Sequence, residues 1–201
     1  MEAKEKIYYH GLYGVAAVLN SARAPESILH SVVESVARTV GAKGCSLMLL
    51  DPDKKVLLHT VAYGLSDWYV RKGPVKADRS ISEAFAGKSV AVLDAATDER
   101  IQYREQAQKE GIASVLSVPM KLREEIIGVI RVYTAEPRRF SDDEIYFIGA
   151  VANLGAIALE NARLYEACQK DYEEFRGDML EWRAALGREW VVEKSVVPPE
   201  E

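Results

Sequence analysis

The chain has 201 residues, of which 48% are hydrophobic and 28% are charged, a balance typical of a soluble globular protein. With 26 Lys and Arg against 31 Asp and Glu, the formal net charge is −5, which argues against a nucleic-acid binder because such proteins usually carry a basic face. No apolar run approaches the roughly 20 residues of a membrane span and residues 1–6 lack the apolar core of a signal peptide, so we expect a cytoplasmic protein without a membrane partner.

The first forty residues predict two amphipathic helices. Ile7, Leu12 and Val15 recur at helical spacing. Pro25 suits the first position of the second helix, and Gly41 suits its C-terminal cap. Apolar side chains line one face of this second helix: Ile28, Leu29, Val32, Val33, Val36, Ala37 and Val40.

The middle of the chain has the pattern of β-strands joined by tight turns. Residues 45–50 and 56–63 are rich in strand-forming side chains and flank the Asp- and Pro-containing turn at 51–55, so they predict an antiparallel hairpin. Residues 112–122 and 126–134 predict a second hairpin in the same way.

Shorter elements are expected between the two hairpins. Ser80 and Glu83 have the spacing of a capping box, which predicts a short helix over residues 81–86. Residues 89–93 predict a further strand, and residues 94–111 predict a loop with a helix around 100–109.

The C-terminal third predicts one long helix over residues 141–188, opened by a second capping box at Ser141 and Glu144. From Phe147 the apolar positions alternate by four and three, a heptad seam typical of a coiled coil. The helix could break at Gly177, with the last segment folded back onto the domain, since glycine costs about 1 kcal/mol in a helix interior. The heptad seam keeps its phase through Gly177, which favours a continuous helix. The expected dimer interface is Val151, Leu154, Ala158, Tyr165, Cys168, Tyr172, Phe175, Met179 and Trp182.

Six short stretches match one known family in order and spacing. They are residues 45–51, 78–90, 94–100, 127–130, 140–144 and 158–165. Together they resemble a GAF domain, the small-molecule sensor module of signalling proteins, over roughly Gly11 to Glu166. The resemblance implies an α+β fold: a six-stranded antiparallel sheet with the terminal helices on one face and, on the other, a ligand pocket under loops and small helices.

The resemblance also sets the expected domain organisation. Residues 1–170 would form the GAF-like domain with its N-terminal helices, residues 141–188 the closing helix that extends into a coiled coil, and residues 189–201 a disordered tail.

The residues that define the ligand subclasses of the family are missing or misplaced. Cyclic-nucleotide-binding members carry an Asn-Lys-Phe-Asp-Glu set, of which only the Phe140 and Glu144 region has a counterpart. Bilin-binding members need a cysteine beside the pocket, a place that neither Cys45 nor Cys168 fits, and members that reduce methionine sulfoxide need several pocket cysteines. The cofactor and the ligand are therefore unknown from the sequence.

The candidate ligand-binding residues lie where the pocket walls are expected, in the irregular stretches 64–78 and 94–111 and near them. The carboxylates and guanidinium of residues 94–100 suit a polar ligand, but they equally suit ion pairs that tie down a loop. The aromatic side chains of residues 63–69 could wall a pocket or cover the open end of the sheet. The candidate set is Tyr63, Trp68, Ile81, Asp94, Asp98, Arg100 and Ser114, with Tyr69 and Ser117 as neighbours on the same elements.

No catalytic constellation stands out in the sequence. His10, His30 and His59 have no metal-binding spacing, and His59, a haem ligand in principle, better fits a partly buried strand histidine. Nucleophile motifs and phosphate-binding glycine loops are also missing. We therefore expect a non-catalytic sensor that binds an unidentified small molecule, forms a homodimer through its last helix and acts on an output protein. The alternatives are a scaffold with a filled pocket and an enzyme acting on a small metabolite.

Overall fold

The computed structural model describes residues 2–20, 25–53, 55–76 and 82–194. The chain divides into two units, Met1–Leu159 and Glu160–Glu201. The first unit ends earlier than the boundary at residue 170 expected from the sequence.

A single antiparallel sheet forms the centre of the first unit. In the part of the chain that the structure describes, it has six strands in the order β3-β2-β1-β6-β5-β4. Both predicted hairpins are confirmed, as β1–β2 and β5–β6, and so is the α+β fold class. The strands are β1 (Gly44–Leu50), β2 (Val56–Tyr63), β3 (Val75–Lys76), β4 (Val90–Val92), β5 (Ser114–Leu122) and β6 (Glu125–Thr134).

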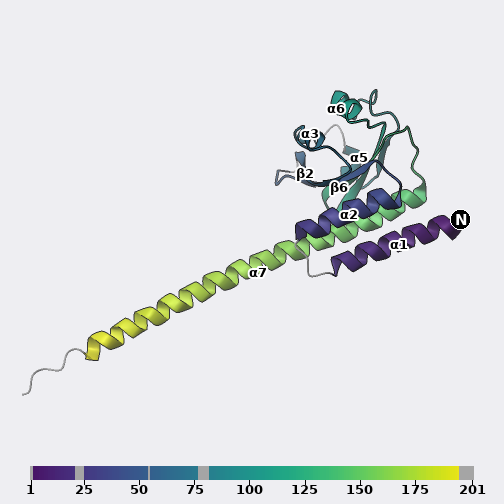
Figure 1. Cartoon of the computed structure of the whole chain (residues 1–201). Helices are drawn as coiled ribbons and strands as arrows, with labels where there is room; N and C mark the ends of the chain where they lie inside the picture. Colours follow the sequence, from purple (N-terminus) through teal and green to yellow (C-terminus); the bar gives the residue numbers. More distant parts are fainter. Residues whose placement is uncertain (1, 21–24, 54, 77–81, 195–201) are drawn as a thin grey trace, which may run out of the picture. The chain divides into compact units, whose positions relative to one another are not determined.

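Helices cover both faces of this sheet (Figure 1). The helix-side face packs against α2 (Pro25–Thr39) and the start of α7 (Asp142–Lys194), and α1 (Glu2–Leu19) lies outside them and packs on α2 and α7. The opposite face, here called the loop-side face, is covered by α3 (Asp67–Val70), α5 (Ser82–Phe85), α6 (Arg104–Lys109) and their loops.

The largest hydrophobic core lies on the helix side. Because successive residues of a strand face opposite sides, Ile130 and Val132 of β6 point toward the helices while Val129 and Tyr133 point away. The ring of Tyr8 in α1 stacks on that of Phe147 in α7, with centroids 5.5 Å apart. Fully buried members of this core include Val15, Val32, Val33, Val36, Leu47, Leu116, Ile130 and Ile148.

Two smaller apolar clusters occupy the loop-side face. One contains Tyr69, Val115 and Tyr133 and packs against α6. The other contains Met48 and Val129 and packs against α5 and β3. These clusters leave a gap in the apolar pattern of the sheet between them, which the polar side chains described below fill.

The stretch 64–78, expected to be irregular, contains α3 and β3. The Ser66 hydroxyl caps α3 by accepting from the Tyr69 amide at 3.2 Å, and Val75 is buried and pairs with Leu57 of β2. The helix expected around 100–109 begins only at Arg104. The capping box at residues 80–83 falls partly outside the described residues.

Helix α7 is one element from Asp142 to Lys194 and runs through Gly177. The predicted capping box is present at its start: the Ser141 amide donates to the Glu144 carboxylate at 2.8 Å, and the Glu144 amide donates to the Ser141 hydroxyl at 3.3 Å. The helix continues past residue 189, where the sequence predicts a tail, and residues 195–201 lie outside the described residues.

The first part of the predicted dimer seam belongs to the chain's own core. Val151 is 0% exposed among the side chains of α2 and the sheet, and Leu154 packs against the same core. The heptad pattern is wrong at Val151 because a helix packed on a sheet repeats its apolar positions at nearly the same spacing as a coiled coil. By length and composition alone, α7 contains a segment apolar enough to cross a membrane; one third (33%) of that segment is buried within the protein.

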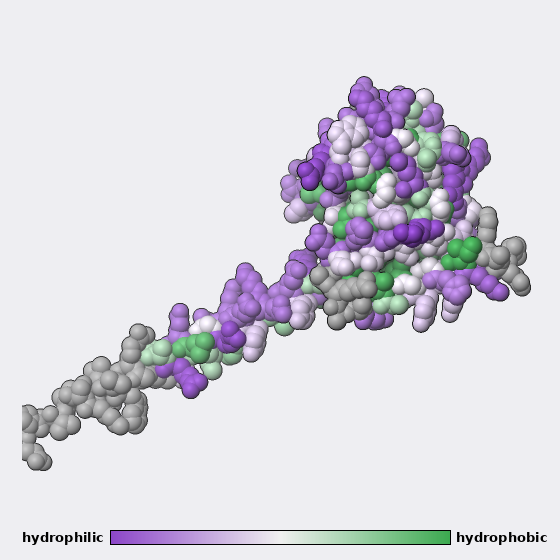
Figure 2. Space-filling model, in the orientation of Figure 1, coloured by the Kyte–Doolittle hydropathy of each residue, from purple (hydrophilic) through white to green (hydrophobic). Residues whose placement is uncertain are grey.

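The seam residues of the second unit are exposed on α7. Figure 2 shows apolar side chains lying among hydrophilic ones along this part of the helix. The large exposed ones are Leu164, Tyr165, Tyr172, Phe175, Met179, Leu180 and Trp182. Cys168 is also exposed and carries a free thiol.

We predict that Gly64→Ala destabilises the fold by about 2–5 kcal/mol. Gly64 follows β2 with φ +70°, and a Cβ there would lie 2.2 Å from the Lys43 carbonyl oxygen. The left-handed conformation costs a side-chain-bearing residue roughly 1–2 kcal/mol, and overpacking adds roughly 1–3 kcal/mol. Urea denaturation followed by circular dichroism measures the loss.

Gly41→Ala is the matched control for this prediction. Gly41 has φ +61° with open space around its added Cβ, so only the conformational cost of about 1–2 kcal/mol applies. Equal losses for the two variants would contradict the close approach at Gly64.

Candidate functional site

Three buried polar side chains lie side by side across the centre of the loop-side face. Arg131 of β6 pairs with Ser46 of β1 on one side and with Ser117 of β5 on the other. All three are buried. Along β6 the flanking residues of the same face, Val129 and Tyr133, belong to the two separate apolar clusters. This polar row therefore crosses the sheet between the two clusters.

Arg131 is an unusual residue for this position because its side chain is only 6% exposed. Its Nε donates to the Ser117 hydroxyl at 3.0 Å. Among the described residues, no carboxylate lies within ion-pair distance of its guanidinium. A buried charge normally has a counter-charge because its desolvation is costly. The described part of the chain thus leaves this positive charge unneutralised at contact distance.

A second cation faces the same region from the segment after α3. The ammonium of Lys72 lies 2.9 Å from Nε2 of His59, donates to the Tyr69 carbonyl oxygen at 3.1 Å and sits 3.7 Å from the centroid of the Tyr69 ring. Burial first, and then the charge of Arg131, lower the pKa of Lys72 to about 7. The influence of Arg131 on Lys72 indicates that the two cations share one positive region.

His59 completes this region on β2. Burial, then the charges of Lys72 and Arg131, lower its pKa to about 3, so the imidazole is neutral at neutral pH. Its Nδ1 is buried and has no hydrogen-bond partner among the described residues. A buried, unpaired ring nitrogen costs free energy and is a candidate contact for a bound molecule.

Two buried tyrosines border the polar row. The hydroxyl of Tyr133 lies 3.0 Å from that of Ser46, and the Tyr133 and Tyr69 rings meet edge to face with centroids 6.0 Å apart. Burial raises the pKa of both phenols, while the nearby charge of Arg131 opposes this shift. Both phenols therefore stay protonated near neutral pH and remain able to donate a hydrogen bond.

Helix α3 is held in place by a polar contact with the segment that follows α6. The amide and the hydroxyl of Ser66 both donate to the Glu110 carboxylate. Since Ser66 also caps α3, this contact positions Tyr69 and Lys72 over the sheet. Glu110 is the acid whose charge raises the pKa of Lys72, but its oxygens are already engaged by Ser66.

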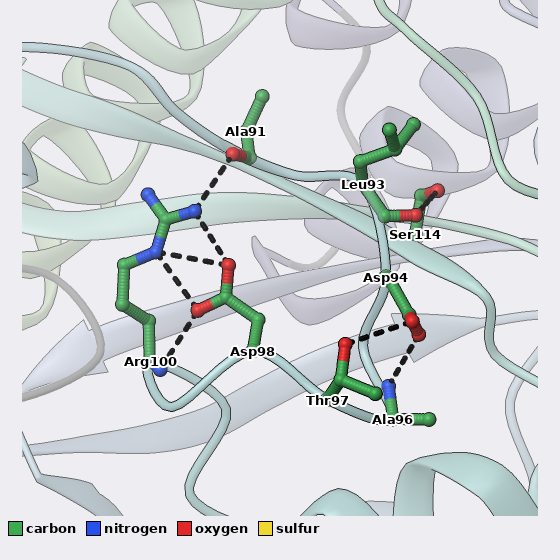
Figure 3. A network of polar contacts seen from close by, with 8 residues as sticks. All are labelled: Ala91, Leu93, Asp94, Ala96, Thr97, Asp98, Arg100 and Ser114. Carbon is green, nitrogen blue, oxygen red and sulfur yellow. Dashed lines mark hydrogen bonds and ion pairs between the residues drawn. The ribbon is translucent and has the colours of Figure 1, made fainter.

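The acidic loop at residues 94–100, a predicted ligand-binding segment, forms its side-chain hydrogen bonds mostly within itself (Figure 3). Asp94 accepts from the Ala96 amide at 3.0 Å and from the Thr97 hydroxyl at 2.8 Å. Asp98 accepts from the Nε and terminal nitrogen of Arg100, and Arg100 also donates to the Ala91 carbonyl. These contacts favour the loop-stabilising interpretation of Asp94, Asp98 and Arg100 over ligand binding.

The remaining candidates are scattered. The Ser114 hydroxyl is buried and engaged, since it donates to the Leu93 carbonyl at 2.6 Å and accepts from the Arg138 amide at 2.9 Å. Trp68 is 52% exposed on α3, whereas its neighbour Tyr69 lies in the loop-side core. Ile81 lies outside the described residues.

Tyr63 faces the helix side, not the pocket side. Its ring lies under Arg38 of α2 and meets the ring of His30 edge to face. The cause is a register shift between β1 and β2, where Leu47 pairs with Val61 but Met48 pairs with His59. An extra residue in one strand reverses which face the following side chains occupy.

The sequence interpretation missed the residues at the centre of the site, although one of them carries a readable signal. Arg131 is the one charged residue in the run Ile126–Tyr133, at a position where alternation places it in the sheet interior. Lys72 gives no such signal, because its burial depends on where α3 packs.

A GAF-domain family model matches residues 22–160 of the chain. The chain belongs to the GAF domain family. The chain matches a sensor from Methanosarcina acetivorans, named as methyl sulfide methyltransferase-associated, with 29% identity over 139 residues. That match covers 66% of this chain and 14% of the relative, so the chain spans a small part of the relative's length.

Solved structures show the same fold at low sequence identity. The GAF domain of a phosphoenolpyruvate-protein phosphotransferase from Coxiella burnetii has a TM-score of 0.70 and 21% identity, covering 80% of this chain and 96% of its own. The free methionine-R-sulfoxide reductase of Neisseria meningitidis, solved with its substrate, has a TM-score of 0.65 and 17% identity, covering 79% and 91%.

Neither cysteine of the chain places a reactive thiol on the loop-side face. Cys45 is fully buried in the helix-side core of this GAF domain, and burial raises the pKa of its thiol, which makes it a poor nucleophile. Cys168 belongs to the second unit. Within the described ranges, no three His, Cys, Asp or Glu side chains are grouped to hold a metal ion.

We predict that the ligand-free protein becomes more stable as the pH rises from 7 to 9. The pKa of Lys72 is about 7 in the folded state against an ordinary value of 10.5, so in this range the unfolded chain keeps a proton that the folded chain releases. The free energy of unfolding then rises with pH, by at most about 1.4 kcal/mol per pH unit. Urea midpoints at pH 7, 8 and 9 measure the slope.

Lys72→Met should flatten this slope, because the titrating group is gone. The range stops at 9 because the tyrosines and Cys45, whose pKa values burial raises, act in the opposite direction at higher pH. Parallel pH profiles for the wild type and Lys72→Met would refute the assignment.

Proposed function

We propose that this GAF domain is a non-catalytic sensor that binds a small molecule at the polar row and the residues around it. The observation that carries the proposal is the buried Arg131, which has a hydroxyl partner but no carboxylate at contact distance in the described residues. The orphaned Nδ1 of His59 points in the same direction, because it leaves a second hydrogen-bonding group without a partner.

Two alternatives make different demands on the same residues. A scaffold with a filled pocket would leave no role for an unneutralised buried charge. An enzyme would need a nucleophile or an acid–base pair, but His59, with its pKa lowered to about 3, is a weak base at neutral pH, and Cys45 faces the helix side. The name of the Methanosarcina relative, a sensor, agrees with the sensory proposal.

Native mass spectrometry of the gently purified protein tests the sensory function. We expect a retained small molecule, or one found by thermal-shift screening of metabolites. Its binding should slow hydrogen exchange in α3 and the segment to Lys72, which face the region of the polar row. A protein that retains nothing, responds to no metabolite and shows uniform protection on this face would favour the scaffold.

We further propose that α7 passes the sensed state to an output protein as part of a homodimer. The support is the row of large apolar side chains exposed on its second part, including Tyr172 and Trp182, which need a partner surface to leave water. A parallel helix pair with heptad spacing would cover them, and symmetric pairs are the commonest assembly. The interface would then begin near Ala158, beyond the buried Val151.

We predict that mild oxidation yields a covalent dimer through Cys168. In a parallel pair, each seam residue faces its own copy, and a disulfide needs Cα atoms about 4.4–6.8 Å apart. The free, exposed thiol of Cys168 satisfies the remaining requirement. A non-reducing gel shows the dimer, and sedimentation of the reduced protein gives its oligomeric state.

The two single-cysteine variants separate the possible sources of this dimer. Cys168→Ser should abolish the covalent species, whereas Cys45→Ser should retain it, because Cys45 is buried in the core. A reduced protein that sediments as a monomer at micromolar concentration would refute the paired-helix part of the proposal.

A further inference from the structure

The chemistry of the loop-side face points to the charge of its ligand. Arg131 and Lys72 are positive, and Arg131 lies in the sheet interior where water does not screen it. The acid whose field reaches Lys72 is Glu110, and its carboxylate is already bound by the amide and hydroxyl of Ser66. The described residues thus provide two cations and no free counter-ion at contact distance.

We propose that the molecule sensed by this domain is a small anion whose carboxylate or phosphate group contacts Arg131 and Lys72. This inference rests on the proposed function, namely that the loop-side face binds a ligand. A guanidinium offers donors in a planar fork that matches carboxylate and phosphate oxygens, while an ammonium adds a point charge. The anion supplies the counter-charge that the burial of Arg131 requires.

His59 contributes a neutral donor to the same anion. A charged Lys72 has only donors to offer, so Nε2 of His59, 2.9 Å away, must accept, and the ring proton then resides on Nδ1. That nitrogen is buried with no partner among the described residues. A ligand oxygen satisfies it without adding another charge to the site.

The surroundings of the polar row indicate the body of the ligand. Apolar clusters border the row on both sides, with Tyr69 and Tyr133 in one and Met48 in the other. A compact apolar or aromatic group attached to the anionic head fits these neighbours, because each end then meets chemistry like its own. The class is therefore a small organic acid or phosphate ester, not a bare inorganic ion.

Binding of the anion is coupled to protonation of Lys72. The groups around Lys72 are His59, Tyr69 and Tyr103 at close range, with Arg131 and Glu110 acting through their charges. The negative charge of a bound anion raises the pKa of Lys72 above its value of about 7 in the ligand-free protein. Affinity then falls as the pH rises above 7, by up to about tenfold per pH unit.

The test uses the full chain and four probes in isothermal titration at pH 6.5 and 8.5. The probes are benzoate, its neutral isostere benzamide, phenyl phosphate and inorganic phosphate. We expect benzoate or phenyl phosphate to bind at least tenfold more tightly than benzamide, and more tightly at pH 6.5. The stronger of the two anions tells a carboxylate site from a phosphate site, and inorganic phosphate measures the head group alone.

Two site variants and one matched control separate charge recognition from fold. Lys72→Met should weaken anion binding at least tenfold and remove its pH dependence. Arg131→Met should abolish anion binding. If this variant fails to fold, the result for Lys72→Met still tests the proposal, because Lys72 is only half-buried. Lys109→Met removes one exposed cation from α6 and should leave the affinity unchanged.

The outcomes distinguish this inference from the proposed function beneath it. If benzoate and benzamide bind with equal affinity, or if Lys72→Met binds the anions as tightly as the wild type, the proposal of an anionic ligand is overturned. The proposed small-molecule sensing is not affected by either result. A neutral metabolite retained by the purified protein also overturns the anionic ligand, whereas a retained anion that Lys72→Met releases supports the inference. No binding of any probe together with no retained molecule refutes both.

Discussion

Everything in this domain depends on how β6 is placed between β1 and β5. As an interior strand it has hydrogen-bonded neighbours on both sides, and from Gly128 onward its residues are buried, so each side chain goes to one face of the sheet or the other. Ile130 and Val132 go to the helix side and anchor α2 and α7, while Arg131 goes to the loop side. The same backbone alternation thus builds the core and delivers a charge into the interior.

The electrostatics of the loop-side face follow from that placement. Burial lowers the pKa of Lys72 and of His59, and the charge of Arg131 adds to both shifts. Lys72 is poised near neutrality and His59 is fixed as a neutral ring. Several like-charged or neutral hydrogen-bond donors around one point reduce the stability of the ligand-free protein. Functional sites commonly carry such a cost in stability.

The sequence predicts the architecture well and the site poorly, for physical reasons. Hairpins and the Ser141–Glu144 capping box depend on local spacing, which the chain carries within a few residues. Tyr63 was expected at the pocket but faces α2, because a one-residue register shift between β1 and its own strand β2 reverses its side. Val151 was expected at a dimer seam, because a helix on a sheet and a coiled coil share nearly one periodicity. Lys72 is buried by tertiary packing of a four-residue helix, which no local pattern announces.

The ends of the sheet also shape how the protein behaves in a crowded solution. In the described part of the chain, β3 has two residues and β4 has three, and these are the outermost strands. Short edge strands expose few unpaired backbone groups to a strand from another molecule, which suppresses edge-to-edge aggregation. A domain built this way can hold a long apolar interior sheet at cellular concentrations without growing into fibres.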